Sequence, residues 1–204
     1  MSYPTTSSDK NAITSEVLAA AIPAPTHGSG SWSVQAKTHI NASPAAVLSA
    51  IRNTNDWPKW SSFLPAGEIS PKSPAPGPSS VDIPTGLPGY LELGSIVKTT
   101  TSMAEDGSKI EGKGREQNIE VTVLKQLDGG KKGLLIAWKS TGLTMIKIER
   151  AFELVDDGNG GCDYHSWETF GGMLAGAAKK KVADVLADRF GDYAKDLKNF
   201  VEAK

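Results

Sequence analysis

Hydrophobic and polar residues alternate over several stretches of this 204-residue chain, and the alternation predicts a β-sheet. Residues 32–40 show the period-two pattern of a half-buried strand. Downstream, stretches rich in Val, Ile and Thr are separated by turns that contain Gly and Asp. They predict strands at residues 67–70, 95–103, 115–127, 134–141, 145–155 and 162–170. Because strands and helices do not alternate along the chain, we predict an antiparallel sheet of about seven strands.

Helical spacing replaces the alternation at two places. Ser43 is expected to cap a helix that starts at Pro44 and ends near Asn53, with one more helical turn soon afterwards. Residues 174–200 form a second and longer helical pattern. Its apolar positions are Leu174, Ala178, Val182, Val185, Leu186, Phe190, Tyr193, Leu197 and Phe200. The sheet is therefore expected to cover one face of a long C-terminal helix.

Residues 1–31 differ in composition from the rest of the chain, since they are rich in Ser, Thr, Pro and Gly. Such a segment offers little apolar surface to offset the entropy of ordering it. We therefore predict a disordered or weakly helical lead, in which residues 14–22 could form a short helix before Pro23. The domain proper is predicted to span residues 32–204.

Composition and charge argue against several classes of function. The chain is 39% hydrophobic and 22% charged with a formal net charge of -1, so it lacks the basic field of a nucleic-acid-binding protein. No stretch approaches the ~20 apolar residues of a membrane span. A single cysteine, Cys162, and the missing signal-peptide pattern favour a cytoplasmic protein. The sequence has neither metal-ligand spacing nor a nucleotide-binding glycine motif, so we predict no metal and no cofactor.

Two segments give the chain a family resemblance. They are Ile40-Asn41-Ala42-Ser43-Pro44-Ala45-Ala46-Val47 and Asn55-Asp56-Trp57-Pro58-Lys59-Trp60. Together they resemble the opening of the START-like, or SRPBCC, superfamily with the Bet v 1 type helix-grip fold, which includes polyketide cyclase/dehydrase and lipid transport proteins. Near the C-terminus, the segment Tyr164-His165-Ser166-Trp167-Glu168-Thr169-Phe170-Gly171-Gly172 resembles the fungal branch of that family.

The resemblance would cover about residues 32–204 and implies an α+β helix-grip fold. In such a fold a curved antiparallel sheet of about seven strands wraps around a long C-terminal helix, and two short helices follow the first strand. A cavity for a hydrophobic ligand lies between sheet and helix. The family includes lipid carriers, hormone receptors and aromatic cyclases, so the fold by itself selects no reaction.

Arg150 is the most informative polar residue of the predicted sheet. In residues 145–155 it shares a face with apolar residues, and this face must point inward. A buried arginine needs a counter-charge or a ligand anion, because an unpaired buried charge costs several kcal/mol. If Asp156 lies opposite Cys162 in the last hairpin, Arg150 lies opposite Glu168, close enough for an ion pair.

A second register of this hairpin remains open. A two-residue turn within residues 157–161 is the stronger hairpin signal, and it would place His165 and Trp167 inside instead. We prefer the first register because it gives the better row of cavity-facing residues. Even in that register, the opposed arginine and glutamate could form a structural pair rather than bind a ligand.

We predict that a set of mostly aromatic and apolar residues lines the cavity. The predicted ligand-binding residues are Trp57, Trp60, Phe63, Tyr90, Arg115, Ile119, Trp138, Ile148, Arg150, Phe152, Tyr164, Glu168, Phe170, Leu186 and Tyr193. Core packing is an alternative for the aromatic residues, and Arg115 could equally lie in solvent. Tyr90 belongs to a proline-rich loop at residues 66–90 that is either a cavity rim or an insertion.

Two functions follow from such a cavity. The first is binding of a hydrophobic small molecule, aromatic, polyketide-like or lipidic, as ligand or substrate. The alternative is a cofactor-independent cyclase, dehydratase or isomerase acting on a polyketide-type intermediate of secondary metabolism, with Glu168 and Arg150 as acid–base groups. Neither function needs nucleic acid or stable membrane insertion, and no oligomeric state is predicted.

Overall fold

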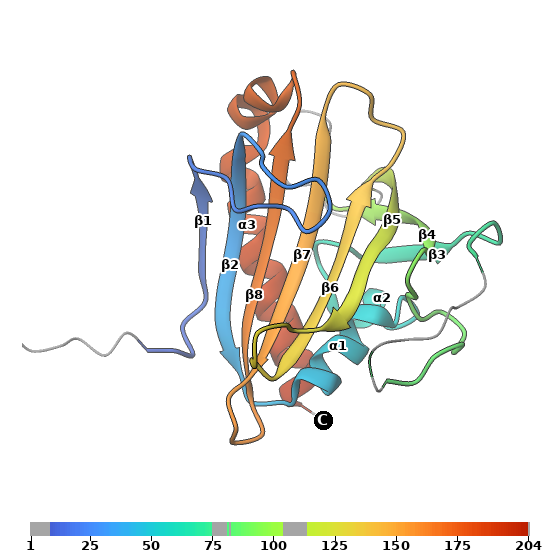
Figure 1. The fold of residues 1–204 in the computed structure, drawn as a ribbon, viewed down its shortest axis with the longest axis vertical. Coiled ribbons are helices and arrows are strands. Elements are labelled where there is room, and N and C mark those ends of the chain that lie inside the picture. The colour runs from blue at the N-terminus through green and yellow to red at the C-terminus, as the bar shows by residue number, and fades with distance from the viewer. Residues whose placement is uncertain (1–8, 75–80, 82, 104–113, 204) are drawn as a thin grey trace, which may run out of the picture.

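The computed structural model describes residues 9–74, 81, 83–103 and 114–203. These residues form an antiparallel sheet, one long helix and two short ones (Figure 1). The strands are β1 (Thr14–Leu18), β2 (Trp32–Ile40), β3 (Ala66–Ile69), β4 (Ile96–Thr101), β5 (Arg115–Gln126), β6 (Gly133–Ser140), β7 (Lys147–Asp156) and β8 (Cys162–Gly171). The helices are α1 (Pro44–Arg52), α2 (Trp57–Trp60) and α3 (Ala175–Glu202).

The sheet has eight strands in the order β1-β2-β8-β7-β6-β5-β4-β3, and each neighbouring pair is antiparallel. Helix α3 runs along one face of the sheet, behind β2 and β8, and α1 and α2 lie near its C-terminal end (Figure 1). This is the predicted α+β helix-grip fold, with eight strands instead of about seven. The turn between β4 and β5 falls outside the described residues.

Local sequence signals explain where the helices begin. The side chain of Ser43 accepts a hydrogen bond from the backbone N–H of Ala46 at 3.3 Å, and Pro44 occupies the first turn of α1, as predicted. Before α3, Gly172 adopts a φ of 86°, and a Cβ there would come within 2.7 Å of the carbonyl oxygen of Met145. Glycine is therefore required where the last strand turns into the long helix.

The last hairpin adopts the register in which Asp156 lies opposite Cys162 and Arg150 lies opposite Glu168. The prediction of this register is confirmed. Asp157 explains why the longer turn forms, because its side chain accepts hydrogen bonds from backbone N–H groups on the far side of the turn at 2.7 and 3.0 Å. The alternating row of β8 that contains Glu168 consequently faces α3.

A β-bulge interrupts the alternation of β5 between Val121 and Val123. Val121 packs in the main core, whereas Val123 packs against Ala137 and Trp167 on the outer face of the sheet. An extra residue on one strand shifts the side chains that follow it to the opposite face. The part of β5 before the bulge therefore faces α3 through its odd-numbered positions.

The N-terminal segment is not the predicted short helix. Residues Thr14–Leu18 form strand β1, which pairs with β2 along the whole of its length. The edge of β2 offers unpaired backbone groups, and pairing with them satisfies the polar backbone of β1. A helix as short as the predicted one would be only marginally stable by itself. The sheet therefore gains its eighth strand from residues predicted to lie outside the domain.

After β1 the chain crosses the outer face of the sheet. Ile22 packs beside Trp167 there, and the indole N–H of Trp167 donates to the carbonyl oxygen of Pro23 at 3.4 Å. This segment covers a small second core on the face opposite α3. The proposed division of the chain into residues 1–31 and 32–204 stays a prediction.

The main core lies between the sheet and α3. The ring of Trp32 stacks on Phe170 with centroids 4.0 Å apart, and its indole N–H donates to the carbonyl oxygen of Ala175 at 2.8 Å. These contacts fix the beginning of α3 against β2 and β8. Among the described helices, none is long and apolar enough to cross a membrane.

Candidate functional site

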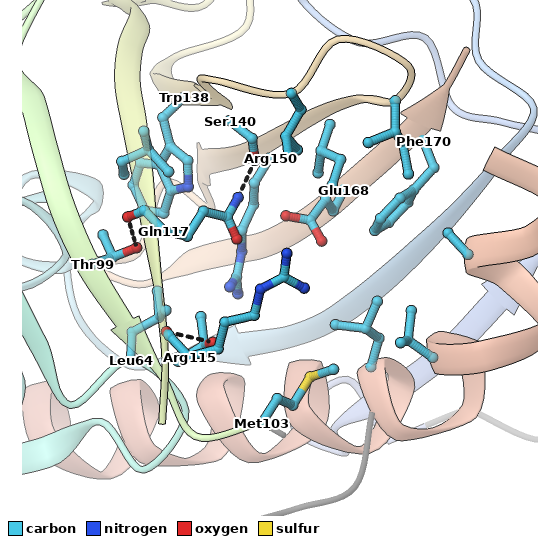
Figure 2. A pocket seen from close by; sticks show the side chains of 18 of the residues that line it. Leu64, Thr99, Met103, Arg115, Gln117, Trp138, Ser140, Arg150, Glu168 and Phe170 are labelled. Carbon is cyan, nitrogen blue, oxygen red and sulfur yellow. Dashed lines mark hydrogen bonds between the residues drawn. The ribbon is translucent and has the colours of Figure 1, made fainter. Parts of the chain in front are cut away.

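A cavity of about 230 Å³ opens between the inner face of the sheet and the first half of α3. Figure 2 shows side chains from several strands and from the helix converging on it. The lining residues are Phe63, Leu64, Thr99, Thr101, Met103, Arg115, Gln117, Ile119, Trp138, Ser140, Leu143, Ile146, Ile148, Arg150, Glu168, Phe170, Ala178, Lys181, Val182 and Leu186. Apolar side chains predominate, and the few charged ones come from β5, β7, β8 and α3.

The structure brings nine of the predicted residues to this cavity. They are Phe63, Arg115, Ile119, Trp138, Ile148, Arg150, Glu168, Phe170 and Leu186. Most lie on strands at alternating inward positions, which is why the hydrophobic pattern could identify them. Their participation in ligand binding stays a prediction.

The other six predicted residues do not line the cavity. Five of them pack in the core around it: Trp57, Trp60, Phe152, Tyr164 and Tyr193. The sixth, Tyr90, lies against α1, where its hydroxyl is 3.3 Å from that of Ser49 and its ring is 5.5 Å from the guanidinium of Arg52. Arg52 in turn forms a 2.8 Å ion pair with Glu92. Residues 87–90 therefore anchor a loop to α1 and do not form a cavity rim.

Arg150 is almost completely buried and is held by aromatic rings instead of a carboxylate. Its guanidinium carbon lies 4.1 Å from the ring centroid of Phe190, 4.4 Å from Tyr193 and 4.8 Å from Phe152. Its Nε donates to the Ser166 hydroxyl at 3.4 Å, a long and weak hydrogen bond. Its Nη2 atom is buried and has no hydrogen-bond partner in the part of the chain that the structure describes. Cation–π attraction stabilises this charge but leaves donor capacity unused.

Glu168 extends into the cavity from β8 (Figure 2). It lies opposite Arg150 in the strand register, yet in the part of the chain that the structure describes no ion pair joins the two side chains. Burial raises the pKa of Glu168 to about 7, and the nearby Arg150 charge opposes that rise. A carboxyl with such a pKa exchanges its proton near neutral pH, so it could act as a hydrogen-bond donor, an acid or a base.

Arg115 lies at the more open side of the cavity, and its guanidinium points toward Glu168 in Figure 2. The Gln117 amide hydrogen-bonds to the Ser140 hydroxyl on the same wall. Lys181 adds a positive charge from α3. These polar residues make the cavity amphipathic, with charge concentrated on one side of an otherwise apolar space.

Eleven lining residues were not predicted from the sequence: the polar Thr99, Thr101, Gln117, Ser140 and Lys181, and the apolar Leu64, Met103, Leu143, Ile146, Ala178 and Val182. Alternation along β4 and β5 could have identified Thr99, Thr101 and Gln117, since they share a face with apolar neighbours that point inward. Lys181 follows Ala178 by three positions on α3, and this helical spacing could have identified it. The five polar positions were not predicted because polar side chains on strands and helices normally face solvent.

No group of three or more metal-ligating side chains occurs among residues 9–74, 81, 83–103 and 114–203. Cys162 is buried, and burial raises the pKa of its thiol to about 12. Its thiol is therefore a poor nucleophile at neutral pH. The charged residues of the cavity are its strongest candidates for chemistry.

Residues 31–203 match a family described as polyketide cyclase / dehydrase and lipid transport. No curated protein matches the chain. A STAR-related lipid transfer protein from Xanthomonas axonopodis superposes with a TM-score of 0.54 at 12% identity, covering 84% of this chain and 86% of that one.

Two further solved structures share the fold. A norcoclaurine synthase from Thalictrum flavum, in complex with a transition-state analogue, has a TM-score of 0.53 at 10% identity and covers 94% of this chain and 97% of its own. The di-domain ARO/CYC protein StfQ of the steffimycin biosynthetic pathway has a TM-score of 0.55 at 11% identity, with 84% of this chain and 51% of that one covered. Identities this low establish a common fold and nothing more specific.

Proposed function

Because the chain belongs to the polyketide cyclase/dehydrase and lipid transport family of the START-like superfamily, we propose that it binds a hydrophobic small molecule between the sheet and α3. The cavity of about 230 Å³ is the observation that supports this proposal. Ligand sites in proteins are typically concave, mostly apolar and supplied with a few polar groups that orient the ligand. This cavity has that composition.

The size of the cavity favours a compact ligand. Typical ligand pockets have volumes of roughly 300–1,000 Å³, and this cavity lies just below that range. A ligand with one or two rings, or a short chain, suits this volume better than a lipid with two long acyl chains. Among the predicted ligand types, we therefore favour an aromatic or polyketide-like molecule.

A matched pair of substitutions on α3 tests the proposal. Ala178 lines the cavity, whereas its neighbour Ala177 is exposed. Ala178→Trp should fill the cavity and lower the affinity for prodan, a fluorescent apolar probe with a two-ring naphthalene body, at least tenfold. Ala177→Trp should leave that affinity unchanged. Equal probe binding by both variants would contradict the proposal, and mass spectrometry of ligands extracted from the wild-type protein would then show whether any small molecule is retained.

We propose enzymatic activity as the second candidate, a cofactor-independent cyclisation, dehydration or isomerisation of a polyketide-type intermediate. The specific observation in its favour is Glu168, whose pKa of about 7 suits proton transfer at neutral pH. Arg150 would stabilise negative charge on a developing enolate. Incubation with a linear triketide thioester, followed by product analysis, separates the two candidates. Turnover that disappears in Glu168→Gln supports an enzyme, and bound but unchanged thioester supports a binding protein.

The remaining predictions are also proposals. We infer from residues 164–172 that the chain belongs to a fungal branch of the family, and from its cysteine content that it functions in the cytoplasm. A role in secondary metabolism would follow if the gene lies beside biosynthetic genes. Imaging of a fluorescent fusion protein would test the compartment.

A further inference from the structure

We infer that the ligand of this cavity is an organic anion, with a carboxylate or similarly small oxyanion that binds between Arg150 and Arg115 while its apolar body fills the rest. This inference rests on the proposed function, because it concerns the same cavity. It goes further by naming the charge of the ligand and the side chains that recognise it. Three independent features of the described residues support it.

The first feature is the charge of the lining. Among the described side chains that line the cavity, Arg115, Arg150 and Lys181 are cationic, and Glu168 is the single acid. Three positive charges against one carboxyl give the cavity a positive potential, and burial of Arg150 weakens screening of its charge by water, whereas Arg115 and Lys181 reach solvent. A neutral apolar ligand would leave these charges uncompensated, whereas an anion would reduce the excess.

The second feature is the unpaired state of Arg150. A buried guanidinium normally forms hydrogen bonds with a carboxylate or with several carbonyl groups, because its five N–H groups are costly to leave without partners. Among the described residues its Nη2 has no hydrogen-bond partner, and its polar neighbours are two hydroxyls, that of Ser166 through one long hydrogen bond and that of Tyr164. The aromatic rings around it hold the charge in place without using its donors. An oxyanion entering the cavity could accept from these unused donors.

Arg189, another buried arginine of this protein, allows a comparison of hydrogen-bond partners with Arg150. Arg189 is as buried as Arg150, but it donates twice to the carbonyl oxygen of Ser102, at 2.9 and 3.3 Å, and pairs with Asp192 at 2.8 Å. Arg189 thus has its partners within the fold. Arg150 lacks such partners, although it faces a cavity in which a ligand could supply them.

The third feature is the position of Glu168 between the cations. The charged groups around Glu168 are Arg150 on β7, Arg115 on β5 and Lys181 on α3. On the other side of β8, the residue opposite Glu168 in the strand register is the uncharged Val34 of β2. Ionised Glu168 would repel a bound carboxylate, but protonated Glu168 would donate a hydrogen bond to it. Burial favours the protonated form. Binding of the anion should therefore be accompanied by uptake of a proton where Glu168 is otherwise ionised.

Naphthalene-2-carboxylate and naphthalene-2-carboxamide provide a direct test, since they have the same size and shape and differ in charge. Titration calorimetry at pH 7 should show the carboxylate binding at least tenfold more tightly than the amide. Arg150→Met should remove this preference. Arg115→Met, at an exposed position, should reduce it. Lys180→Met changes an exposed lysine next to Lys181 that does not line the cavity, and it should leave the preference unchanged.

Proton uptake gives a second measurement. Calorimetry at pH 8 in buffers of different ionisation enthalpy should show about one proton taken up per carboxylate bound, and Glu168→Gln should abolish the uptake. Affinity of the wild type for the carboxylate should fall as pH rises above 7.

The possible outcomes separate this inference from the proposed function. Equal affinities for carboxylate and amide would overturn the inference while supporting hydrophobic binding. Absence of binding by both compounds would overturn the inference and the proposed function together. A tenfold preference that persists in Arg150→Met and in Arg115→Met would also overturn it, because the charge recognition would then lie elsewhere.

Discussion

Two carboxylates, the fully buried Glu149 on β7 and the half-buried Glu168 on β8, lie one residue apart in the register of neighbouring strands but face opposite sides of the sheet. Glu149 is fully buried on the outer face and accepts hydrogen bonds from the backbone N–H and the hydroxyl of Thr26, at 3.1 and 2.8 Å. It also accepts from the hydroxyl of Thr122 at 2.9 Å. Glu168, on the inner face, has no such partner among the described residues.

The fold supplies hydrogen-bond donors to Glu149, whereas among the described residues it supplies none to Glu168, so a ligand could interact with Glu168 instead. A buried carboxylate with several donors stabilises the folded chain, since each donor would otherwise lack a partner. A buried carboxyl without donors lowers stability when ionised, so its retention needs another explanation. We therefore assign the outer glutamate to structure and the inner one to the site.

The outer site also explains why the N-terminal segment lies on the sheet. Thr26 reaches Glu149 across 123 positions of sequence, and the imidazole of His27 lies 3.8 Å from the same carboxylate. These contacts, together with the apolar packing of Ile22, attach the segment to the outer face. On the inner face α3 packs against the sheet, and among the described residues a cavity of about 230 Å³ remains between them.

The largest effect is expected for Glu149→Gln. The glutamine amide would direct N–H groups toward donors that the carboxylate now satisfies, so the free energy of unfolding should fall by about 3 kcal/mol. Urea denaturation followed by circular dichroism measures this change. Glu153→Gln is the matched control on the same strand and face, where the side chain is partly exposed, and it should change stability by less than about 0.5 kcal/mol. Equal effects of the two substitutions would contradict the structural assignment of Glu149.

Glu168→Gln should act in the opposite direction and depend on pH. The pKa of Glu168 is about 7 in the folded chain against an ordinary value of 4.5, so the folded state binds its proton more tightly than the unfolded state. Wild-type stability should therefore fall as pH rises from about 4.5 to 7, then level off. Each unit of pKa shift corresponds to roughly 1.4 kcal/mol of unfolding free energy. Because Glu168 borders the cavity and is partly screened by solvent, we expect a smaller total loss, about 2 kcal/mol.

The glutamine variant lacks this titration. The difference in unfolding free energy between variant and wild type should therefore grow in favour of the variant between pH 5 and pH 8, as measured by urea denaturation at each pH. Using the difference cancels the titration of other groups, such as His165, whose pKa burial lowers to about 4. A difference that stays constant across this range would mean that Glu168 is not held in its protonated form.

Most of the fold could be predicted from the sequence because its signals are local. Alternation identified β2 and the strands from β4 to β8, and helical spacing identified α3. The segment from Thr14 to Leu18 could not be identified in this way, since its strand conformation depends on the open edge of β2. The burial of Glu149 depends in turn on the segment that follows, which local alternation along β7 does not predict.

The site was predictable to a similar extent. Counting residues across the last turn placed Arg150 opposite Glu168, and the structure has this register. The same count also predicted an ion pair that the described residues do not form. Its place is taken by rings of Phe190 and Tyr193 on α3, which belong to a recognisable apolar stripe. The local sequence pattern does not predict which strand the apolar stripe of α3 will contact, because the position of the helix depends on the whole sheet.

The smallest effects come from removing one hydroxyl on each face of the sheet. Thr26→Val keeps the shape of the side chain but removes a donor to Glu149, so unfolding free energy should fall by about 1 kcal/mol. Tyr193→Phe removes a buried hydroxyl that has no hydrogen-bond partner among the described residues, and it retains the ring beside Arg150. Stability of this variant should stay within about 0.5 kcal/mol of the wild type or rise, because an unsatisfied polar group is lost.

Urea denaturation of both hydroxyl variants under the same conditions gives the two values directly. A loss of 1 kcal/mol or more in Tyr193→Phe, using ~1 kcal/mol as the worth of a typical hydrogen bond, would mean that its hydroxyl has a partner, such as an ordered water. In that case the inner face would satisfy its own polar groups as the outer face does, and the contrast between Glu149 and Glu168 would no longer separate structure from ligand binding.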